Sequence, residues 1–406
     1  MEKWDDCETA LARMAAAAQK QLEGYGKPEL REEIKTLVKR ALGRGTALRD
    51  PVFWPAGMLA LGLEEYAGRL TRRTEREGAA KTEEEGRGDG TGKTVGSQKP
   101  DVRQEALDAD KAVCNFLKKW ITGGAKVTYV DDALSGYVLL RRYERMAESG
   151  LHGGNTGDGA MEMEPEAYRQ AARRIAAQMK AAPRDQAGAI VYRAGRGNEY
   201  IFADGAGMTA MFLSRYGALF DDREATELAV TQLRSFLRCG MDRRSGLPYH
   251  GYELTDKVKY GLVGWGRAVG WLLMGLVVTV TSLPETHGAY EELKRGYSRL
   301  VLATEQWQRE DGMYAWQLGA AEGPADTSAT AMISYAAAVG VRADILGEEH
   351  RIRLNQSIKA LLEMTGQDGR VQGALAECMG FAEHPQTYGC YPWGQGAALA
   401  FLSAMR

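Results

Sequence analysis

The 406-residue chain lacks the features that mark several classes of protein. No apolar run approaches the length of a transmembrane span, and the acidic start, followed by an amphipathic stretch to Leu22, differs from a secretion signal. The five cysteines are scattered without a CxxC pair, which predicts reduced thiols and no zinc site. A formal net charge of −2 offers no basic surface for nucleic acid or lipid. We therefore expect a cytoplasmic protein with no nucleic-acid or membrane partner.

Proline and strand patterns are scarce as well. The best alternating stretch, residues 189–193, is short and bounded by glycines, so it fits a hairpin or an extended loop. Helical periodicity instead runs through residues 8–22, 31–42, 168–179 and 224–237, and glycines cluster between such segments. These patterns predict an all-α protein with many short turns between helices.

Two polar stretches interrupt the helical pattern. Residues 72–99 and 149–166 carry charged and small residues without apolar periodicity, which is typical of solvated inserts. Within the first, residues 86–94 read GRGDGTGKT, but Arg87 occupies the place of the first glycine of a phosphate-binding loop and no apolar strand precedes it. We expect one domain spanning residues 1–406, with both inserts in its loops.

A repeat organises the rest of the chain. Six segments open with an aromatic or acidic residue, in one case after a glycine, continue with Gly, Ala or Ser, and end in a dense apolar helix. They are residues 53–59, 131–137, 204–210, 264–271, 326–332 and 393–398. The later ones recur roughly every 60 to 70 residues, and the earlier spacings are longer by about the length of the inserts.

Each interval between these segments holds one further helix that is more charged and more one-sided. Helices that are apolar on all faces are buried, whereas one-sided helices cover them. Six of each predict an (α/α)6 barrel. The alternative is a stack of unrelated helices or an open solenoid. A solenoid would have polar caps at both ends, whereas residues 393–405 form another apolar helix.

In such a barrel the N-termini of the inner helices meet at one mouth, which would collect aromatic and charged side chains around one cavity. The predicted set is Trp54, Asp131, Asp132, Asp204, Trp265, Arg267, Trp271 and Trp393. Aromatic faces stack on sugar rings, carboxylates bind hydroxyls, and Arg267 offers the bidentate contact that suits a uronate.

Several of these residues have two interpretations. Asp204 is either a helix cap or, in its apolar setting, a general acid. Of Asp131 and Asp132, one is expected to cap and the other to face the cavity, and Asp326 is expected to be a cap. His250 lies in an aromatic loop and is either structural or part of the site.

Taken together, these residues resemble glycoside hydrolase families 88 and 105, the unsaturated glucuronyl and rhamnogalacturonyl hydrolases. The similarity runs from about Trp54 to the C-terminus. It is carried by Asp204-Gly205 with Met208 and residues 212–216, and by residues 183–184, 249–252, 264–271, 326–329 and 393–396. The chain differs at Ala268-Val269, where a more polar pair is usual, and at Tyr192, where a histidine is common.

The resemblance implies removal of the terminal 4,5-unsaturated uronic acid that polysaccharide lyases leave on an oligosaccharide. Asp204 would protonate C4 and then assist a water that attacks C5, without the usual pair of carboxylates. His250 and Arg267 would orient the uronate, and Trp265 and Trp271 would form a wall of the pocket. Neither a metal nor a cofactor is implied; the partner is an unsaturated oligouronide, and the assembly is a monomer or a homodimer.

Three alternatives stay open. One is an inverting glycosidase that pairs Asp131 or Asp132 with Asp204. Another is a sugar epimerase, which requires two histidines and has only His250 and His384 to use. The third is a barrel that binds oligosaccharide without activity.

Overall fold

Twelve α-helices make up most of the part of the chain that the computed structural model describes, which is residues 2–25, 52–85, 102–148, 163–192, 199–378, 380–381 and 383–405. Six of them are rich in Ala, Gly and large apolar residues and are buried along most of their described length. They are α3 (Trp54–Glu85), α5 (Ala133–Glu148), α7 (Ala203–Phe220), α9 (Gly266–Ser282), α11 (Thr327–Arg342) and α13 (Pro392–Ala404).

The other six helices bury one face and expose the other. They are α1 (Glu2–Gly24), α4 (Val102–Thr122), α6 (Pro165–Lys180), α8 (Arg223–Cys239), α10 (Tyr290–Glu305) and α12 (Arg351–Glu363). Their one-sided pattern places apolar residues against the inner helices and charged residues toward solvent. Each outer helix from α4 to α12 packs against the inner helix next to it in sequence.

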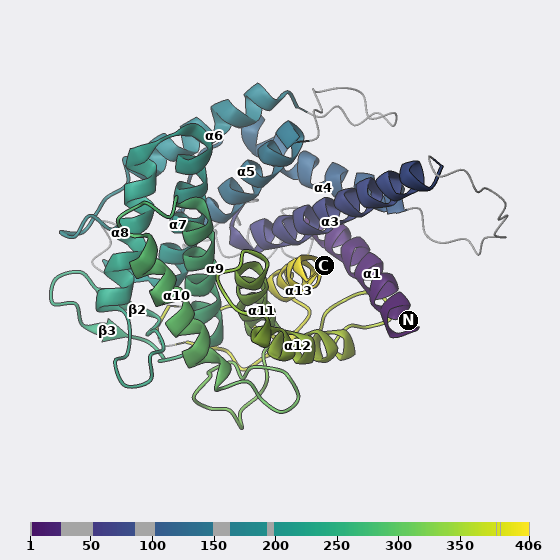
Figure 1. Ribbon diagram of the computed structural model, residues 1–406. Coiled ribbons are helices and arrows are strands. Elements are labelled where there is room, and N and C mark those ends of the chain that lie inside the picture. The colour runs from purple at the N-terminus through teal and green to yellow at the C-terminus, as the bar shows by residue number, and fades with distance from the viewer. Residues whose placement is uncertain are drawn as a thin grey trace, which may run out of the picture.

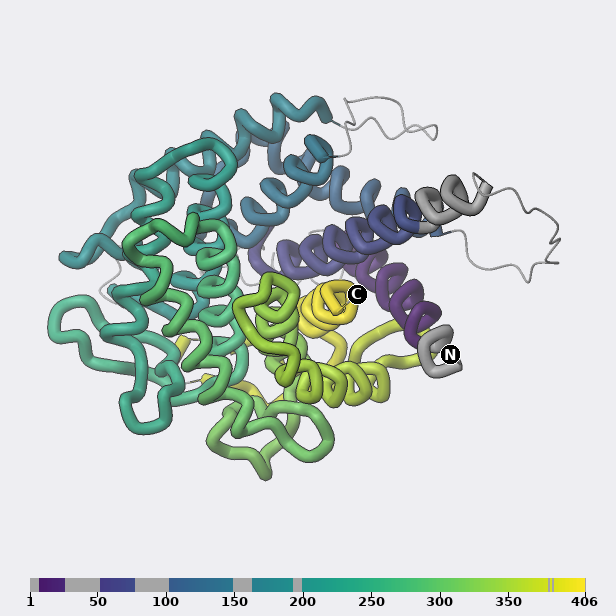
Figure 2. The backbone as a smooth tube through the Cα atoms, in the orientation of Figure 1, coloured from purple at the N-terminus to yellow at the C-terminus, as the bar shows by residue number. Residues whose placement is uncertain are grey.

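The inner helices form a closed ring. Each contacts the next in chain order, and α13 returns to pack against α3, as Figure 1 shows. The last outer position is taken by α1, which lies against both α13 and α3 beside the C-terminus (Figure 2). The predicted (α/α)6 barrel is confirmed, and the open solenoid is excluded because the first and last inner helices touch.

Glycines allow the inner helices to come close together. A Cβ on Gly207 of α7 would lie 2.2 Å from the backbone oxygen of Trp271 in α9, and a Cβ on Gly275 would lie 2.6 Å from the Cα of Gly207. No real side chain fits at such distances, so α7 and α9 meet backbone to backbone. This contact sets the spacing of the two helices whose first turns carry Asp204 and Arg267.

Short strands lie at the openings of the inner helices. β1 (Tyr200–Phe202), β2 (Gly251–Glu253) and β3 (Lys259–Tyr260) form an antiparallel sheet, in which Phe202 pairs with Gly251. β4 (Ala374–Leu375) pairs with β5 (Tyr388–Gly389). The stretch predicted as a hairpin or extended loop contributes one isolated bridge, between Ile190 and Arg184, and the two small sheets were not predicted.

The predicted inserts need one correction. Residues 72–85 are not linker, because α3 continues as a helix to Glu85. The segment is polar but rich in Glu, Arg, Lys and Ala, which favour helix even without an apolar face. Residues 86–99 and 149–162, and the predicted helix at 31–42, lie outside the described residues. Among the helices described, none is long and apolar enough to cross a membrane.

Candidate active site

A cavity of about 720 Å³ opens where the first turns of the inner helices meet. Seven of the nine predicted site residues line it, six from four inner helices or the turns before them and His250 from the loop before β2 (Gly251–Glu253). Its lining consists of Phe53, Trp54, Asp131, Tyr192, Tyr200, Phe202, Asp204, Met208, His250, Trp265, Arg267, Trp271, Glu377, Cys378, Gly380 and Phe381. Aromatic rings therefore surround a small number of ionisable groups, as in many sites for small polar ligands.

Asp204 lies in the first turn of α7, directly after β1. The helix is capped from Phe202 without a side-chain hydrogen bond, so Asp204 does not serve as the cap. Its carboxylate is 15% exposed, and its Oδ2 accepts no hydrogen bond from the residues that the structure describes. Of the two interpretations of Asp204, the cap is excluded, and a carboxylate that faces the cavity remains.

His250 is the nearest ionisable partner of Asp204, with 3.1 Å between its Nε2 and Asp204 Oδ2. The ring is 3% exposed and lies among Phe202, Trp265 and Phe381, at centroid distances of 4.8, 4.5 and 5.3 Å. Its backbone oxygen accepts a hydrogen bond from the nitrogen of Ala203, at the start of α7. The aromatic loop and the first turn of α7 thus hold His250 and Asp204 as one unit.

Asp131 and Asp132 have different environments although they are adjacent in η1 (Val130–Asp132). Asp131 lines the cavity, and its Oδ2 accepts a short hydrogen bond from the hydroxyl of Tyr192. Asp132 is not among the lining residues; its Oδ2 accepts hydrogen bonds of 2.7 and 3.0 Å from the backbone nitrogens of Thr128 and Tyr129. Asp132 therefore organises the turn that presents Asp131.

Three tryptophans line the cavity, Trp54, Trp265 and Trp271, and a fourth packs against Trp54. Trp54 meets Trp271 edge to face at a centroid distance of 6.0 Å, and Trp265 lies against His250. Trp393 is not among the lining residues: it packs behind Trp54 at 5.1 Å, and its Nε1 donates to the backbone oxygen of Leu375. The structure therefore places Trp393, which was predicted to bind substrate, against Trp54 and outside the cavity lining.

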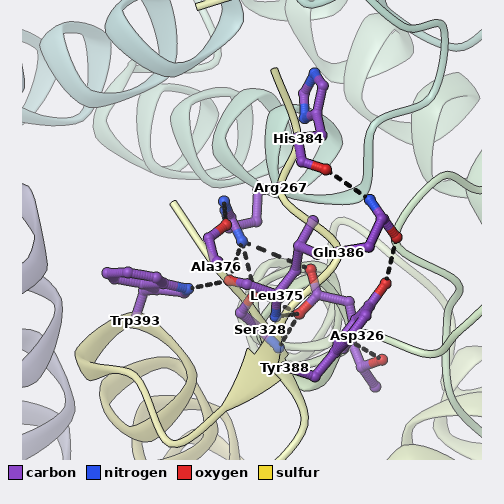
Figure 3. Close-up of polar contacts among 10 residues, drawn as sticks. Arg267, Asp326, Ser328, Leu375, Ala376, His384, Gln386, Tyr388 and Trp393 are labelled. Atoms are coloured by element: carbon purple, nitrogen blue, oxygen red, sulfur yellow. Dashed lines mark hydrogen bonds and ion pairs between the residues drawn. The ribbon is translucent and has the colours of Figure 1, made fainter. Parts of the chain in front are cut away.

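Arg267 lines the cavity, but both of its terminal nitrogens donate hydrogen bonds to the backbone. Nη1 donates to the backbone oxygen of Leu375 and Nη2 to that of Ala376, both at 2.8 Å, as Figure 3 shows. The guanidinium also lies 4.9 Å from the ring of Trp265, a cation–π contact. Any contact with a uronate would come in addition to these bonds.

Asp326 is the N-cap of α11, as expected, since its Oδ1 accepts from the backbone nitrogen of Ser328. It also accepts from the nitrogen of Leu375 and lies 3.8 Å from Arg267, and both charges are fully buried. Arg267 and Asp326 together bind the backbone of Leu375 in β4, one at its oxygen and the other at its nitrogen. The residues that follow β4, Glu377 and Cys378, are thereby brought to the cavity.

Nine lining residues were not predicted. They are Phe53, Tyr192, Tyr200, Phe202, Met208, Glu377, Cys378, Gly380 and Phe381. Tyr200 and Phe202 alternate just before Asp204, which was a usable signal, whereas nothing in the local sequence marks Phe381. Burial, with a contribution from the charge of Asp204, raises the pKa of the Cys378 thiol to about 12, so Cys378 is neutral at ordinary pH.

Among the residues described, no group of three His, Cys, Asp or Glu side chains lies close enough together to hold a metal ion. The ionisable groups of the cavity are instead spread among aromatic rings. The arrangement can stack a sugar ring, hold its hydroxyls and carboxylate, and present one carboxyl group, from Asp204, to a reacting carbon.

Residues 160–406 match the sequence profile described as Glycosyl Hydrolase Family 88. The chain is also 33% identical over 166 residues to Protein Atu3128 of Agrobacterium fabrum, a match that covers 37% of this chain and 70% of that protein. The matched range of this chain includes Asp204, His250 and Arg267. The predicted resemblance is thereby confirmed.

The fold is shared with solved structures of low sequence identity. One is a possible member of glycoside hydrolase family 105 from Klebsiella pneumoniae, with a TM-score of 0.67 and 19% identity, covering 86% of this chain and 81% of that one. Another is an unsaturated glucuronyl hydrolase from Bacillus sp. GL1, responsible for the degradation of glycosaminoglycan. Its TM-score is 0.63 at 14% identity, covering 98% of this chain and 95% of that one.

Proposed function

Because the chain belongs to Glycosyl Hydrolase Family 88, we propose that it removes a terminal 4,5-unsaturated uronic acid from lyase-generated oligosaccharides. The observation that carries this proposal is Asp204, a carboxylate that caps no helix and faces an aromatic cavity beside His250. A single carboxylate suffices if the reaction is hydration of the C4=C5 double bond rather than direct displacement at the anomeric carbon.

In the proposed reaction Asp204 begins protonated and transfers its proton to C4, which leaves positive charge on C5. A water adds to C5 and gives a proton back to the Asp204 carboxylate, so the enzyme returns to its starting state. The hydroxyl now on C5 makes that carbon a hemiketal. Opening of the hemiketal breaks the C5–O5 bond and gives a ketone at C5 and a hemiacetal at C1. The C1 hemiacetal then collapses to the aldehyde, and the aglycone leaves as its alcohol with the proton of the C1 hydroxyl.

The remaining residues would bind and orient the unsaturated ring. Trp54, Trp265 and Trp271 offer faces and edges for its flat side, and Asp131 would accept a hydrogen bond from a ring hydroxyl. Arg267 places a positive charge near the uronate carboxylate. Asp132 and Trp393 would act through the residues that they hold, Asp131 and Trp54.

The position of the second histidine, His384, argues against a sugar epimerase. His384 packs against Trp265 and Trp316, at centroid distances of 5.1 and 5.7 Å, and is not among the residues that line the cavity. Burial, together with the charges of His250 and Arg267, lowers the pKa of His384 to about 4. His384 lies 6.1 Å from the ring of His250, but a neutral imidazole outside the cavity lining is poorly suited to exchange protons with a sugar.

The proposal is tested with unsaturated oligouronides and their saturated counterparts. The protein is expected to abolish the absorbance of the vinyl ether and to release an oligosaccharide shortened by one residue. The saturated compounds are expected to stay intact. Cleavage of both at similar rates would indicate an ordinary glycosidase, and tight binding without turnover would indicate a barrel that only binds.

Replacing Tyr192 with phenylalanine is expected to lower kcat/KM on the unsaturated substrate by about tenfold, because a hydrogen bond to a charged group is lost. The ring itself is retained, so its packing against Gly205 and Phe202 is unchanged. Tyr192→His, which restores the residue common in the family, keeps a donor and is expected to recover part of the loss. The rates are followed by the vinyl-ether absorbance.

Tyr290→Phe is the matched control, since it removes a tyrosine hydroxyl on α10 that bonds to Glu285, outside the cavity. It is expected to retain wild-type kcat/KM. If Tyr192→Phe did the same, the contact with Asp131 would have no part in the reaction.

A further inference from the structure

Three arginines gather around one carboxylate inside the ring of inner helices, and we call them the arginine cluster: Arg72 of α3, Arg141 of α5 and Arg342 of α11. The carboxylate is that of Glu65, whose Oε1 lies 3.2 Å from Nη2 of Arg141 and whose Oε2 lies 3.9 Å from Nη1 of Arg342. Arg342 is the last residue of α11, whereas the cavity opens at the first turns of the inner helices. The arginine cluster therefore lies at the opposite end of the barrel from Asp204.

The charges of the arginine cluster are not balanced. Burial opposes the ionisation of Glu65, but the charges of all three arginines outweigh it and lower the pKa of Glu65 from 4.5, so this carboxylate is ionised at neutral pH. Among the residues that the structure describes, no second carboxylate lies within ion-pair distance of the cluster. The neighbouring Arg145 has its own partner, Glu64, at 2.8 Å. Three positive charges around one negative charge leave a surplus of two.

The surplus lies on the two most exposed members of the cluster. The side chain of Arg342 is 41% exposed, and Arg72 is exposed as well. Neither donates a hydrogen bond to a residue that the structure describes. Partial burial lowers the pKa of Arg72; the charge of Glu65 opposes this effect, and the charges of Arg342 and Arg141 add to it. Two like charges are thus held near each other, with N–H groups that can still bind a ligand from solvent.

Packing holds these side chains in place. Tyr335 of α11 donates a hydrogen bond of 3.0 Å to Glu65 of α3, which joins the two helices that carry Arg342 and Arg72. A Cβ on Gly68 would lie 3.3 Å from Nη1 of Arg72, so the side chain of Arg72 lies back along its own helix, over the face that carries Glu65. Groups that are positioned before a ligand arrives lose less entropy when it binds.

We propose that the arginine cluster binds a tetrahedral oxyanion, a phosphate or a sulfate group, between Arg72 and Arg342. Each guanidinium offers two parallel N–H groups, which match two oxygens of such a group. A doubly charged anion equals the surplus charge of the cluster, whereas chloride carries one charge and cannot accept two parallel bonds from each guanidinium. The site lies apart from the cavity and does not depend on the proposed reaction.

The test measures the dissociation constants of inorganic phosphate and of sulfate by isothermal titration calorimetry, with sodium chloride keeping the ionic strength constant. The wild-type protein is expected to bind both anions. Equal affinities would assign the shared oxyanion geometry, and binding of one alone would assign that anion. In a separate measurement, phosphate should raise the temperature of unfolding of the wild type, because the arginines come together only in the folded ring.

Arg72→Gln is expected to weaken binding of the anion about tenfold, because a charge-assisted hydrogen bond is lost. Arg342→Gln should have the same effect. Each change removes one of several like charges at an exposed position, so both variants should fold. Both should also keep the wild-type kcat/KM on the unsaturated substrate, since the cluster is distant from Asp204.

Arg299→Gln is the matched control, since it removes an exposed arginine of α10, an outer helix that carries no member of the cluster. It is expected to keep the wild-type dissociation constant. A wild-type protein that binds neither anion would overturn the proposal. So would folded Arg72→Gln and Arg342→Gln variants that bind as tightly as the wild type, because the anion would then lie elsewhere. Neither result would affect the proposed function, which the vinyl-ether absorbance tests separately.

Discussion

Asp204→Asn is expected to reduce kcat on an unsaturated oligouronide by about 10²- to 10⁴-fold, the usual contribution of a general acid. Asparagine has nearly the same shape but carries no proton that it can give to C4 and no charge with which to take one from water. Substrate binding should change little, because the cavity keeps its form. The measurement is the rate at which the vinyl-ether absorbance disappears under saturating substrate.

The loss is expected without a loss of structure, because Asp204 makes no capping hydrogen bond at the start of α7. Asp221→Asn is the matched control, since Asp221 is exposed, ends the same helix and has a left-handed φ of 51° that asparagine tolerates. It should keep wild-type kcat. If Asp204→Asn stayed within a few-fold of the wild-type rate, the acid would have to be another residue.

Glu65→Gln is expected to lower the free energy of unfolding by about 3 kcal/mol, the scale of breaking a buried ion pair. Glu65 of α3 is 1% exposed and accepts a hydrogen bond of 3.0 Å from Tyr335 of α11. Arg141 of α5 lies 3.2 Å from it and Arg342 of α11 lies 3.9 Å from it. The neutral variant would leave these cations without their shared carboxylate between three inner helices.

The same contacts predict how the effect depends on pH. Burial opposes ionisation of Glu65, but Arg141 and Arg342 outweigh it, with the help of Tyr335, and the pKa is lowered from 4.5. The stabilisation is therefore complete above the unfolded pKa and is lost as the pH falls through the lower, folded value. Denaturant unfolding followed by tryptophan fluorescence should show the gap between wild type and Glu65→Gln narrowing in acid.

Glu348→Gln is the comparison for this variant, because Glu348 forms an ion pair with Arg351 at the surface. The Glu348 side chain is 72% exposed. Exposed pairs contribute about 0–1 kcal/mol, so this change should be small. If Glu65→Gln cost no more than Glu348→Gln, the buried cluster would be replaceable by neutral hydrogen bonds.

Most of the fold was predictable because its signals are local. All six small-residue segments begin inner helices, since a helix buried on every side needs small and apolar residues along its whole length. The prediction of an insert at residues 72–85 was wrong because the local signal for a helix was missing there. That segment is polar on all faces and has no apolar periodicity, so no helix was predicted there. Its helix-favouring residues nevertheless extend α3 to Glu85.

The candidate site was predictable as a set but not in its details. Asp131 and Asp132 are neighbours of the same type, and only the turn of η1 decides that one faces the cavity and the other binds backbone nitrogens. Arg267 carries the charge expected near a uronate, yet its bonds to Leu375 and Ala376 come from a distant segment. Neither the orientation of the two aspartates nor the hydrogen bonds of Arg267 could be predicted from the residues adjacent in sequence.

The sequence by itself determined the six-helix ring, the mouth at which its helices begin, and the family to which the chain belongs. Each of these depends on periodicity, composition or the order of motifs, which are properties of the sequence alone. Only the tertiary structure decided that Asp204 is not a cap, that Trp393 packs against Trp54 and that Phe381 reaches His250. These features depend on rotations of single side chains and on contacts between segments far apart in sequence. These contacts form only when the ring of inner helices closes and the first turns of those helices come together.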